Sequence, residues 1–186
     1  MGYAGGKHSD PTYDDIGDHT EAFQLDFDPA RITYAELLEA FWTGHQPTRP
    51  SYSRQYMAAV FCESAEQERL AKAARDRVAE KLQIAIQTIQ TPVITGARFY
   101  LAEDYHQKYY LRHDALLMRE LSLRPAELVD STLAARLNGY VAGKGFLARL
   151  REEVETYGLS PTAVEHLERV VIAKSRPWTA TPATID

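Results

Sequence analysis

The sequence predicts an α+β or α/β sheet with helices packed on it, followed by a helical C-terminal part, and two patterns support this prediction. Between residues 21 and 91, segments of strand-like composition alternate with segments of helical spacing in the order βαβαβ. After residue 100, the apolar residues follow helical spacing only. A chain of 186 residues is long enough for one compact domain with a C-terminal appendage.

The N-terminal part contains the first expected strand and helix. Residues 1–18 are rich in Gly, Pro, Asp and Tyr without a regular period, which predicts an ordered surface loop. In residues 21–28, apolar and polar side chains alternate as in a strand with one buried face. Thr33 and Glu36 form a capping box before an apolar stripe, which predicts a helix to about Thr43.

The middle of the chain continues the alternation. A Pro-rich loop at residues 46–53 precedes a segment, residues 56–62, with the composition of a short buried strand. Ser64 caps a second expected helix that runs to about Leu82. The β-branched residues of segment 84–91 predict the strand that completes the sheet.

The C-terminal part is predicted to be helical. Residues 102–113 have helical spacing, and about three short helices are expected from Pro125 onward. The final residues are rich in Pro and Thr and are expected to be disordered. The sequence therefore divides into a sheet-containing part (1–112), a helical extension (113–176) and a disordered tail (177–186).

The composition excludes several classes of protein. A net charge of -5 and an isoelectric point near 5.7 argue against a nucleic-acid or anionic-membrane surface, which would need clustered Lys and Arg. No stretch reaches the roughly twenty apolar residues of a membrane helix, and the polar residues 7–18 contain no signal-peptide core. We therefore expect a cytoplasmic protein without nucleic-acid or membrane partners.

A single cysteine, Cys62, excludes an internal disulfide, a redox dithiol and a multi-cysteine metal site. It lies among Val60, Phe61 and Glu63 without a nearby cation, so its pKa is expected to be raised. On a strand it would lie roughly 20 Å from Tyr56, because six residues of extended chain separate the two. Cys62 is therefore predicted to be a packing residue.

Six short blocks of the sequence, in their order, resemble the signature blocks of the type A peptide methionine sulfoxide reductases. Each block alone is a moderate signal, but the order and spacing of all six make the resemblance specific. It covers about residues 1–112, and residues 113–186 resemble a C-terminal extension of one branch of that family. The blocks are Gly2-Tyr-Ala-Gly-Gly6, Pro11-Thr-Tyr13, Gly17-Asp-His-Thr-Glu21, Phe27-Asp-Pro29, Arg54-Gln-Tyr56 and Phe99-Tyr-Leu-Ala-Glu-Asp-Tyr-His-Gln107.

The resemblance implies a fold and a reaction. The fold would be a ferredoxin-like mixed sheet with helices packed on it, lacking the first strand and helix of the family. The reaction would reduce methionine (S)-sulfoxide, in peptides, in proteins or as the free amino acid, and so repair oxidative damage. A thiolate attacks the sulfoxide sulfur and an acid protonates the departing oxygen, which leaves methionine and a sulfenic acid that an external thiol reduces.

The resemblance also implies roles for particular residues. Glu21 would be the general acid, with a pKa raised enough to hold its proton, and the hydroxyls of Tyr3 and Tyr56 would bind the sulfoxide oxygen. Without the resemblance, Glu21 would be interpreted as a solvated residue and the tyrosines as packing residues. His19 lies in a matched block, where a role in orienting the loop is favoured over a catalytic one, and it is also counted among the residues that would bind the substrate.

No metal or bound cofactor is expected. A metal site would need histidines at i, i+4 spacing with an adjacent acid, and no pair meets this condition among His19, His45, His106 and His113. The reductant would be a thioredoxin-like protein or a low-molecular-weight thiol, because no cysteine follows Cys62 to resolve a sulfenic acid within the chain.

The sequence departs from the family pattern at two points. Residues 50–55 contain no acid where the family places an Asp before the second pocket tyrosine, so its role would fall to Ser51, to Ser53 or to no residue. The Gly-Cys-Phe-Trp motif of the family, which supplies the nucleophile, lies upstream of Tyr3, and this chain has no such residues. We therefore expect a chain that is truncated by a late gene start and is inactive as written.

Two other classes of function stay open. A degenerate pocket could bind methionine sulfoxide through Glu21, Tyr3 and Tyr56 without reducing it. Alternatively, the protein could be an interaction module whose sheet is completed by a strand of another chain. An upstream Gly-Cys-Phe-Trp segment in the same reading frame would favour the enzyme over both.

Overall fold

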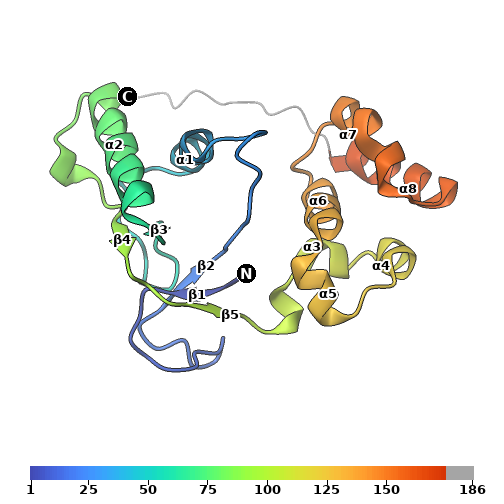
Figure 1. The fold of residues 1–186 in the computed structure, drawn as a ribbon, viewed down its shortest axis with the longest axis horizontal. Coiled ribbons are helices and arrows are strands. Elements are labelled where there is room, and N and C mark those ends of the chain that lie inside the picture. The colour runs from blue at the N-terminus through green and yellow to red at the C-terminus, as the bar shows by residue number, and fades with distance from the viewer. Residues whose placement is uncertain (175–186) are drawn as a thin grey trace. The chain divides into compact units, whose positions relative to one another are not determined.

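The computed structural model describes residues 1–174, which belong to two compact units: Met1–Glu103, and a second unit that begins at Asp104 (Figure 1). All strands of the described chain lie in the first unit, and the second is built from helices. The prediction of an α+β protein with a helical C-terminal part is therefore confirmed. The tail expected at residues 177–186 lies outside the described residues.

One sheet of the first unit is antiparallel and consists of β2 (Thr20–Ala22), β1 (Gly2–Ala4) and β5 (Phe99–Leu101), in that order. The central strand β1 places Tyr3 directly opposite Glu21 on β2 and opposite Tyr100 on β5. The predicted loop over residues 1–18 is therefore wrong at β1. This strand depends on partners that lie far along the chain, which a local pattern does not reveal.

Strand β2 is shorter than the sequence predicts. It ends at Ala22, whereas the alternation of apolar residues predicted a strand over residues 21–28. Phe23 and Leu25, which were expected on the buried face, are exposed, Phe23 by 66%. The alternation indicates which side chains share a face, but no described strand pairs with residues 23–28.

The second sheet of this unit has two parallel strands, β3 (Val60–Cys62) and β4 (Val93–Thr95), with helix α2 (Ala65–Leu82) between them in the chain. Helix α2 contacts both strands and also helix α1 (Tyr34–Thr43), and Figure 1 shows α1 next to α2. The buried side chains of these elements form one core, made of Leu38, Trp42, Val60, Cys62, Ala71 and Ala74.

Helices α1 and α2 begin where the sequence predicts because their caps are local. The Thr33 hydroxyl accepts the N–H of Glu36 at 3.2 Å, and the Glu36 carboxylate accepts the N–H of Thr33 at 2.7 Å. The Ser64 hydroxyl accepts the N–H of Gln67 at 3.1 Å. Each cap binds a backbone donor that the first helical turn leaves unpaired.

The strand predicted over residues 84–91 is wrong. This segment contains a 3-10 turn, η1 (Ile86–Thr88), and β4 begins only at Val93. The N–H of Gln90 donates to the carbonyl oxygen of Pro47 at 2.7 Å, which ties the segment to a loop and not to a strand. The β-branched composition thus indicated that a strand lies nearby, but it did not indicate where the strand begins.

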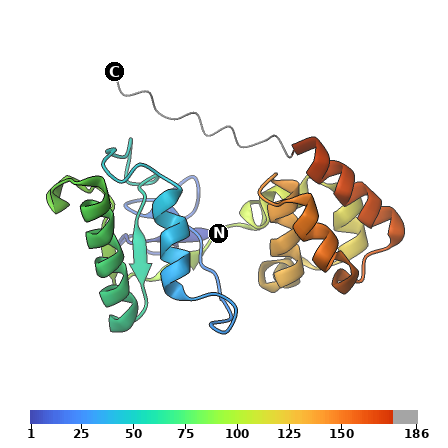
Figure 2. The same cartoon turned by 90° about the horizontal axis from the view of Figure 1, so that it is seen from above.

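The second unit consists of short helices around buried leucines (Figure 2). Residues 102–113 do not form one helix, because Lys108 adopts a φ of 49° and interrupts it. Four α-helices follow from Pro125, where about three were expected. The elements are η2 (Asp104–His106), α3 (Tyr109–Arg112), α4 (Ala115–Leu121), α5 (Pro125–Asp130), α6 (Thr132–Val141), α7 (Leu147–Glu153), η3 (Val154–Tyr157) and α8 (Pro161–Lys174).

The ion pair between Arg136 and Glu153 makes the stability of the second unit depend on pH. Arg136 donates two hydrogen bonds to the Glu153 carboxylate, and the Tyr140 hydroxyl donates a third. Burial alone would raise the pKa of Glu153, but these hydrogen bonds outweigh it and lower the pKa to about 2. The pair therefore stabilises the folded unit above the ordinary glutamate pKa of 4.5, and this contribution is lost as the pH falls toward about 2.

We expect the free energy of unfolding to decrease as the pH is lowered through this acid range, and Glu153→Gln to reduce that slope. Urea denaturation followed by circular dichroism at a series of pH values measures the effect. Glu155 is exposed, so Glu155→Gln serves as the matched control and should keep the slope of the parent protein. A slope that is unchanged in Glu153→Gln would contradict this role of the ion pair.

The described residues contain neither a membrane-spanning helix nor a cluster of metal ligands. Among residues 1–174, no helix combines the length and the apolar character that crossing a bilayer requires. The same part of the chain contains no group of three or more His, Cys, Asp or Glu side chains placed to hold a metal ion. His45, one of the histidines considered above, is bound by the Phe41 carbonyl and the Thr91 hydroxyl, each at 2.9 Å.

Candidate functional site

The loop between β1 and β2 is organised by two consecutive residues. Asp18 Oδ1 accepts the N–H groups of His8 and Lys7 at 3.1 and 2.7 Å, and these hydrogen bonds lower the pKa of Asp18. His19 is buried, and its Nδ1 accepts the N–H of Gly6 at 3.1 Å. Its Nε2 therefore carries the proton and donates it to the His8 carbonyl oxygen at 2.8 Å. Both nitrogens of His19 are thus bound to the loop backbone.

Tyr3 lies beneath the surface of the first unit. Its side chain is only 2% exposed, and its hydroxyl donates to Glu103 Oε2 at 2.7 Å. The other carboxylate oxygen, Oε1, accepts the N–H of Tyr13 at 2.8 Å. Because the Tyr3 hydroxyl already donates its proton to Glu103, it does not present a free donor to a surface ligand in this arrangement.

Glu21 is half-buried on β2 and is held by the segment that precedes Tyr56. Its backbone N–H donates to the Gln55 carbonyl oxygen at 2.9 Å, and its Oε1 accepts from Gln55 Nε2 at 2.7 Å. Glu21 shares a face of the sheet with Tyr3, because residues directly opposite on antiparallel strands point to the same side. The carboxyl group is therefore fixed by a side chain next to Tyr56.

Arg54 fastens the same segment to the loop. Its Nε donates to the Asp18 carbonyl oxygen at 2.5 Å, and its Nη2 donates to the Gly5 carbonyl oxygen at 2.7 Å. In return, the Arg54 carbonyl oxygen accepts the Thr20 hydroxyl at 2.9 Å. The block Arg54-Gln-Tyr56 thus docks along β2 through its own backbone and side chains.

Tyr56 is 56% exposed, and its pKa reflects the groups around it. Partial desolvation raises the pKa of Tyr56, and the adjacent Tyr13 and Glu21 raise it further, Tyr13 partly through a hydrogen bond between the side chains. The side chains of Tyr13 and Tyr56 therefore meet, and Glu21 is near enough for its charge to act on Tyr56. We call Tyr13, Glu21 and Tyr56 the acid–tyrosine cluster.

The structure brings together some of the residues singled out from the sequence and separates others. Glu21 and Tyr56 meet in the cluster, whereas the polar atoms of Tyr3 and His19 are engaged inside the unit. Tyr13 was missed. Its block, Pro11-Thr-Tyr13, matches the family pattern without indicating a role for the tyrosine, although the distance of eight residues to Glu21 allows a loop to bring the two together.

The cluster has the groups needed to bind and protonate an oxygen atom. Two phenol hydroxyls can donate to a polarised oxygen, and a carboxyl group beside them can supply a proton. Ser51, one of the alternatives to the family's Asp, donates its hydroxyl to the Ser53 carbonyl oxygen at 2.6 Å within its own loop. The cluster contains no thiol.

Sequence comparison identifies the family of this chain. The sequence model of the family described as "Peptide methionine sulfoxide reductase" matches residues 1–133. The chain belongs to this family. The match includes the whole first unit and the acid–tyrosine cluster, and it extends into the helices of the second unit.

Individual relatives of the chain carry the name of the same family. A peptide methionine sulfoxide reductase of Drosophila melanogaster is 41% identical over 164 residues, covering 87% of this chain and 65% of the relative. Peptide methionine sulfoxide reductase A5 of Arabidopsis thaliana is 36% identical over 147 residues, covering 76% and 57%. MsrA of Rhodospirillum centenum is 39% identical over 118 residues, covering 58% and 54%. The chain thus spans 65% or less of the length of these relatives.

Cys62 lies in the core of the first unit. It is only 4% exposed, and burial raises the pKa of its thiol. Its Sγ lies 3.9 Å from the Tyr34 hydroxyl, and its side chain packs in the core with Leu38 and Trp42. The prediction that Cys62 is a packing residue with a raised pKa is confirmed.

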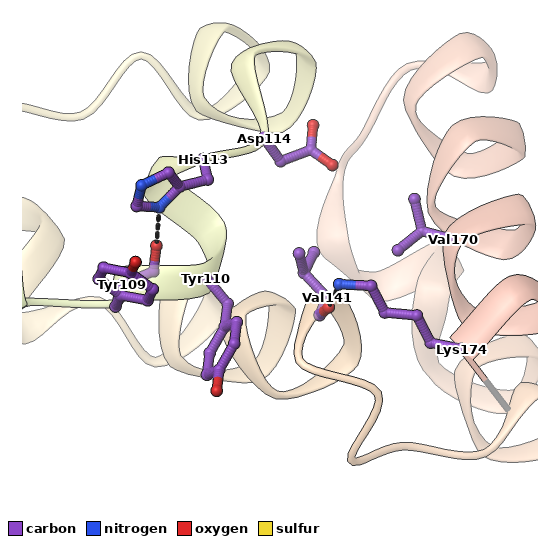
Figure 3. Close-up of a pocket in the computed structure, with 7 residues that line it drawn as sticks. All are labelled: Tyr109, Tyr110, His113, Asp114, Val141, Val170 and Lys174. Atoms are coloured by element: carbon purple, nitrogen blue, oxygen red, sulfur yellow. Dashed lines mark hydrogen bonds between the residues drawn. The ribbon is translucent and has the colours of Figure 1, made fainter. Parts of the chain in front are cut away.

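A hollow of about 370 Å³ in the second unit is separate from the acid–tyrosine cluster (Figure 3). Its polar groups are engaged with neighbours: His113 Nδ1 donates to the Tyr109 carbonyl oxygen at 2.7 Å, and Lys174 Nζ donates to the Val141 carbonyl oxygen at 2.5 Å. Asp114 accepts from His166 Nε2 at 2.7 Å. We assign no reaction to this hollow, whose lining residues are Tyr109, Tyr110, His113, Asp114, Val141, Val170 and Lys174.

Proposed function

We propose that this chain forms the oxygen-binding and proton-donating part of a peptide methionine (S)-sulfoxide reductase. The observation that carries the proposal is the acid–tyrosine cluster, in which the side chains of Tyr13 and Tyr56 meet and Gln55, the neighbour of Tyr56, holds the carboxyl group of Glu21. Membership of the family supports the substrate class, because the similar proteins are named peptide methionine sulfoxide reductases.

In this proposal the two phenols bind the sulfoxide oxygen while Glu21 protonates it. A thiolate attacks the sulfur and forms a sulfur–sulfur bond, while the sulfoxide oxygen takes up protons and leaves as water. Water then cleaves the sulfur–sulfur bond, which releases methionine and leaves a cysteine sulfenic acid. Hydroxyl donors aimed at the oxygen stabilise the negative charge that develops on it. Gln55 keeps the carboxyl of Glu21 in place through the hydrogen bond to Oε1.

Tyr13 takes the role that the sequence analysis gave to Tyr3. Tyr13 is exposed and lies next to Tyr56, whereas the Tyr3 hydroxyl is buried against Glu103. The bonds of His19 to Gly6 and His8 support a role in holding the loop in place of a contact with the substrate.

The attacking thiol comes from outside residues 1–186 in this proposal, since Cys62 is buried in the core. A strand and a helix that carry this thiol would join the two sheets of the first unit into one mixed, ferredoxin-like sheet. The exposed apolar side chains of Phe23 and Leu25 support such a further strand. The sulfenic acid would be reduced by a thioredoxin-like protein or a low-molecular-weight thiol, which the reducing cytoplasm supplies.

The proposal is tested by fusing a family segment that carries the Gly-Cys-Phe-Trp motif ahead of Met1. We expect turnover of a methionine sulfoxide peptide and a higher free energy of unfolding to appear together. The segment supplies both the thiol and the further strand that would join the two sheets. The same fusion with its added Cys replaced by Ser is the control and should gain stability only. A folded fusion with a titratable added thiol and no turnover would contradict the proposal.

A second candidate is a module that binds methionine sulfoxide without reducing it. The observation that favours it is an intact acid–tyrosine cluster that lacks a thiol. Calorimetric titration of residues 1–186 with a methionine sulfoxide peptide and with its reduced form distinguishes the two candidates. Selective binding of the oxidised peptide that is lost in Tyr56→Phe, together with an inactive fusion, would favour the binding module.

A further inference from the structure

Glu103 connects two parts of the first unit that lie far apart in the sequence. It follows β5, and its Oε2 accepts the hydroxyl of Tyr3 on the central strand at 2.7 Å. Its Oε1 accepts the backbone N–H of Tyr13 in the long loop at 2.8 Å. One half-buried carboxylate thus ties the loop to the centre of the antiparallel sheet.

Glu103 binds the backbone N–H of Tyr13 and leaves the hydroxyl of Tyr13 to other partners. The backbone of Tyr13 is fixed by Glu103, while its hydroxyl meets Tyr56 at the surface. A hydroxyl on an exposed loop contributes to binding only if its backbone is held, since ordering it otherwise costs conformational entropy. The hydrogen bonds to Glu103 supply that restraint, and Tyr3 anchors them to a strand paired on both sides.

We propose that Glu103 is a positioning residue of the acid–tyrosine cluster, acting through the Tyr13 backbone and anchored by the buried hydroxyl of Tyr3. It does not touch the substrate. Its relevance to turnover rests on the proposed function, but the geometric coupling between Glu103 and Tyr56 can be measured without any turnover.

The test follows the phenol of Tyr56 by carbon NMR in residues 1–186 labelled at tyrosine Cζ, with Tyr56→Phe and Tyr13→Phe to assign the signals. In the parent protein the pKa of Tyr56 is raised by desolvation and by Tyr13 and Glu21. Glu103→Ala removes both hydrogen bonds, so we expect the pKa of Tyr56 to fall toward the ordinary tyrosine value. Tyr3→Phe removes the anchor alone and should cause a smaller fall.

Glu103→Gln separates positioning from charge. The amide oxygen can still accept the N–H of Tyr13, and the amide N–H can donate to the Tyr3 hydroxyl, while the negative charge is lost. Positioning therefore predicts that Glu103→Gln keeps the raised pKa of Tyr56. Glu63→Ala is the matched control, because Glu63 also joins distant segments, through Gln24 Nε2 at 2.5 Å, and should leave Tyr56 unchanged.

The outcomes distinguish the two proposals. A fall in Glu103→Ala, with Glu103→Gln and Glu63→Ala like the parent, supports positioning whether or not the thiol-bearing fusion turns over. Equal falls in Glu103→Ala and Glu103→Gln, or no fall in folded Glu103→Ala, would overturn it. If Glu103→Ala does not fold, Tyr3→Phe decides: a titration identical to that of the parent would overturn the proposal.

Discussion

Replacing Glu21 by Gln should lower the turnover of a methionine sulfoxide peptide by about a hundredfold or more in the fusion that carries an attacking thiol. An amide keeps the size of the side chain and can still accept the hydrogen bond from Gln55 Nε2, so the fold should be retained. It cannot donate the proton that the sulfoxide oxygen needs when its bond to sulfur breaks. Steady-state kinetics should show the loss mainly in kcat, because the interaction is made in the transition state.

The control for this experiment is Glu63→Gln, which changes an exposed carboxylate that accepts from Gln24 and lies outside the cluster. It should keep the rate of the parent fusion. Circular dichroism and urea denaturation should give the same midpoint for Glu21→Gln and the parent. Near-normal rates in Glu21→Gln from neutral to alkaline pH would show that the acid lies elsewhere and would remove the assignment of Glu21.

The helices could be predicted from the sequence because the signals that define them are local. The capping pairs Thr33 with Glu36 and Ser64 with Gln67 lie within one turn, so a short window of sequence contains the whole interaction. The apolar stripes behind these caps also repeat within each helix. A helix boundary is therefore determined by residues that are neighbours in the sequence.

The strands could not be placed in the same way, because a strand is defined by its partner. Tyr3 lies in a Gly-rich segment without strand character, yet β1 is the central strand, since it pairs with residues about Glu21 and Tyr100. Phe23 and Leu25 show the opposite case, in which a clear alternation has no described partner and stays exposed. Composition indicates a tendency to form strands, whereas pairing decides their positions.

The sequence could likewise identify some residues of the candidate site and not others. Glu21 and Tyr56 were identified from their blocks, and the structure places them together through Gln55. The choice between Tyr3 and Tyr13 could not be made from the sequence, because both are tyrosines in matched blocks of the same loop region. The structure distinguishes them by their hydrogen bonds to Glu103. The carboxylate of Glu103 accepts the hydroxyl of Tyr3, but it accepts only the backbone N–H of Tyr13.

Residues 1–186 alone should show no methionine sulfoxide reductase activity with dithiothreitol, thioredoxin or glutathione as the reductant. The only cysteine is Cys62, whose buried side chain packs against α1 and whose raised pKa leaves little thiolate at neutral pH. A sulfoxide bound by Tyr56 and Glu21 at the surface would not meet this sulfur. The assay is the formation of methionine from an oxidised peptide, measured by mass spectrometry under turnover conditions.

The matched variants for this prediction are Cys62→Ser and Cys62→Ala. Both should leave the absent activity of residues 1–186 unchanged, and in the thiol-bearing fusion Cys62→Ala should keep the full rate, because Cys62 acts only through packing. Alkylation with iodoacetamide should be slow in the native chain and fast after unfolding in urea, as expected for a buried thiol. Turnover by residues 1–186 that disappears in both Cys62 variants while the fold is retained would show that this thiol reaches the substrate, and the placement of the nucleophile outside the chain would then be wrong.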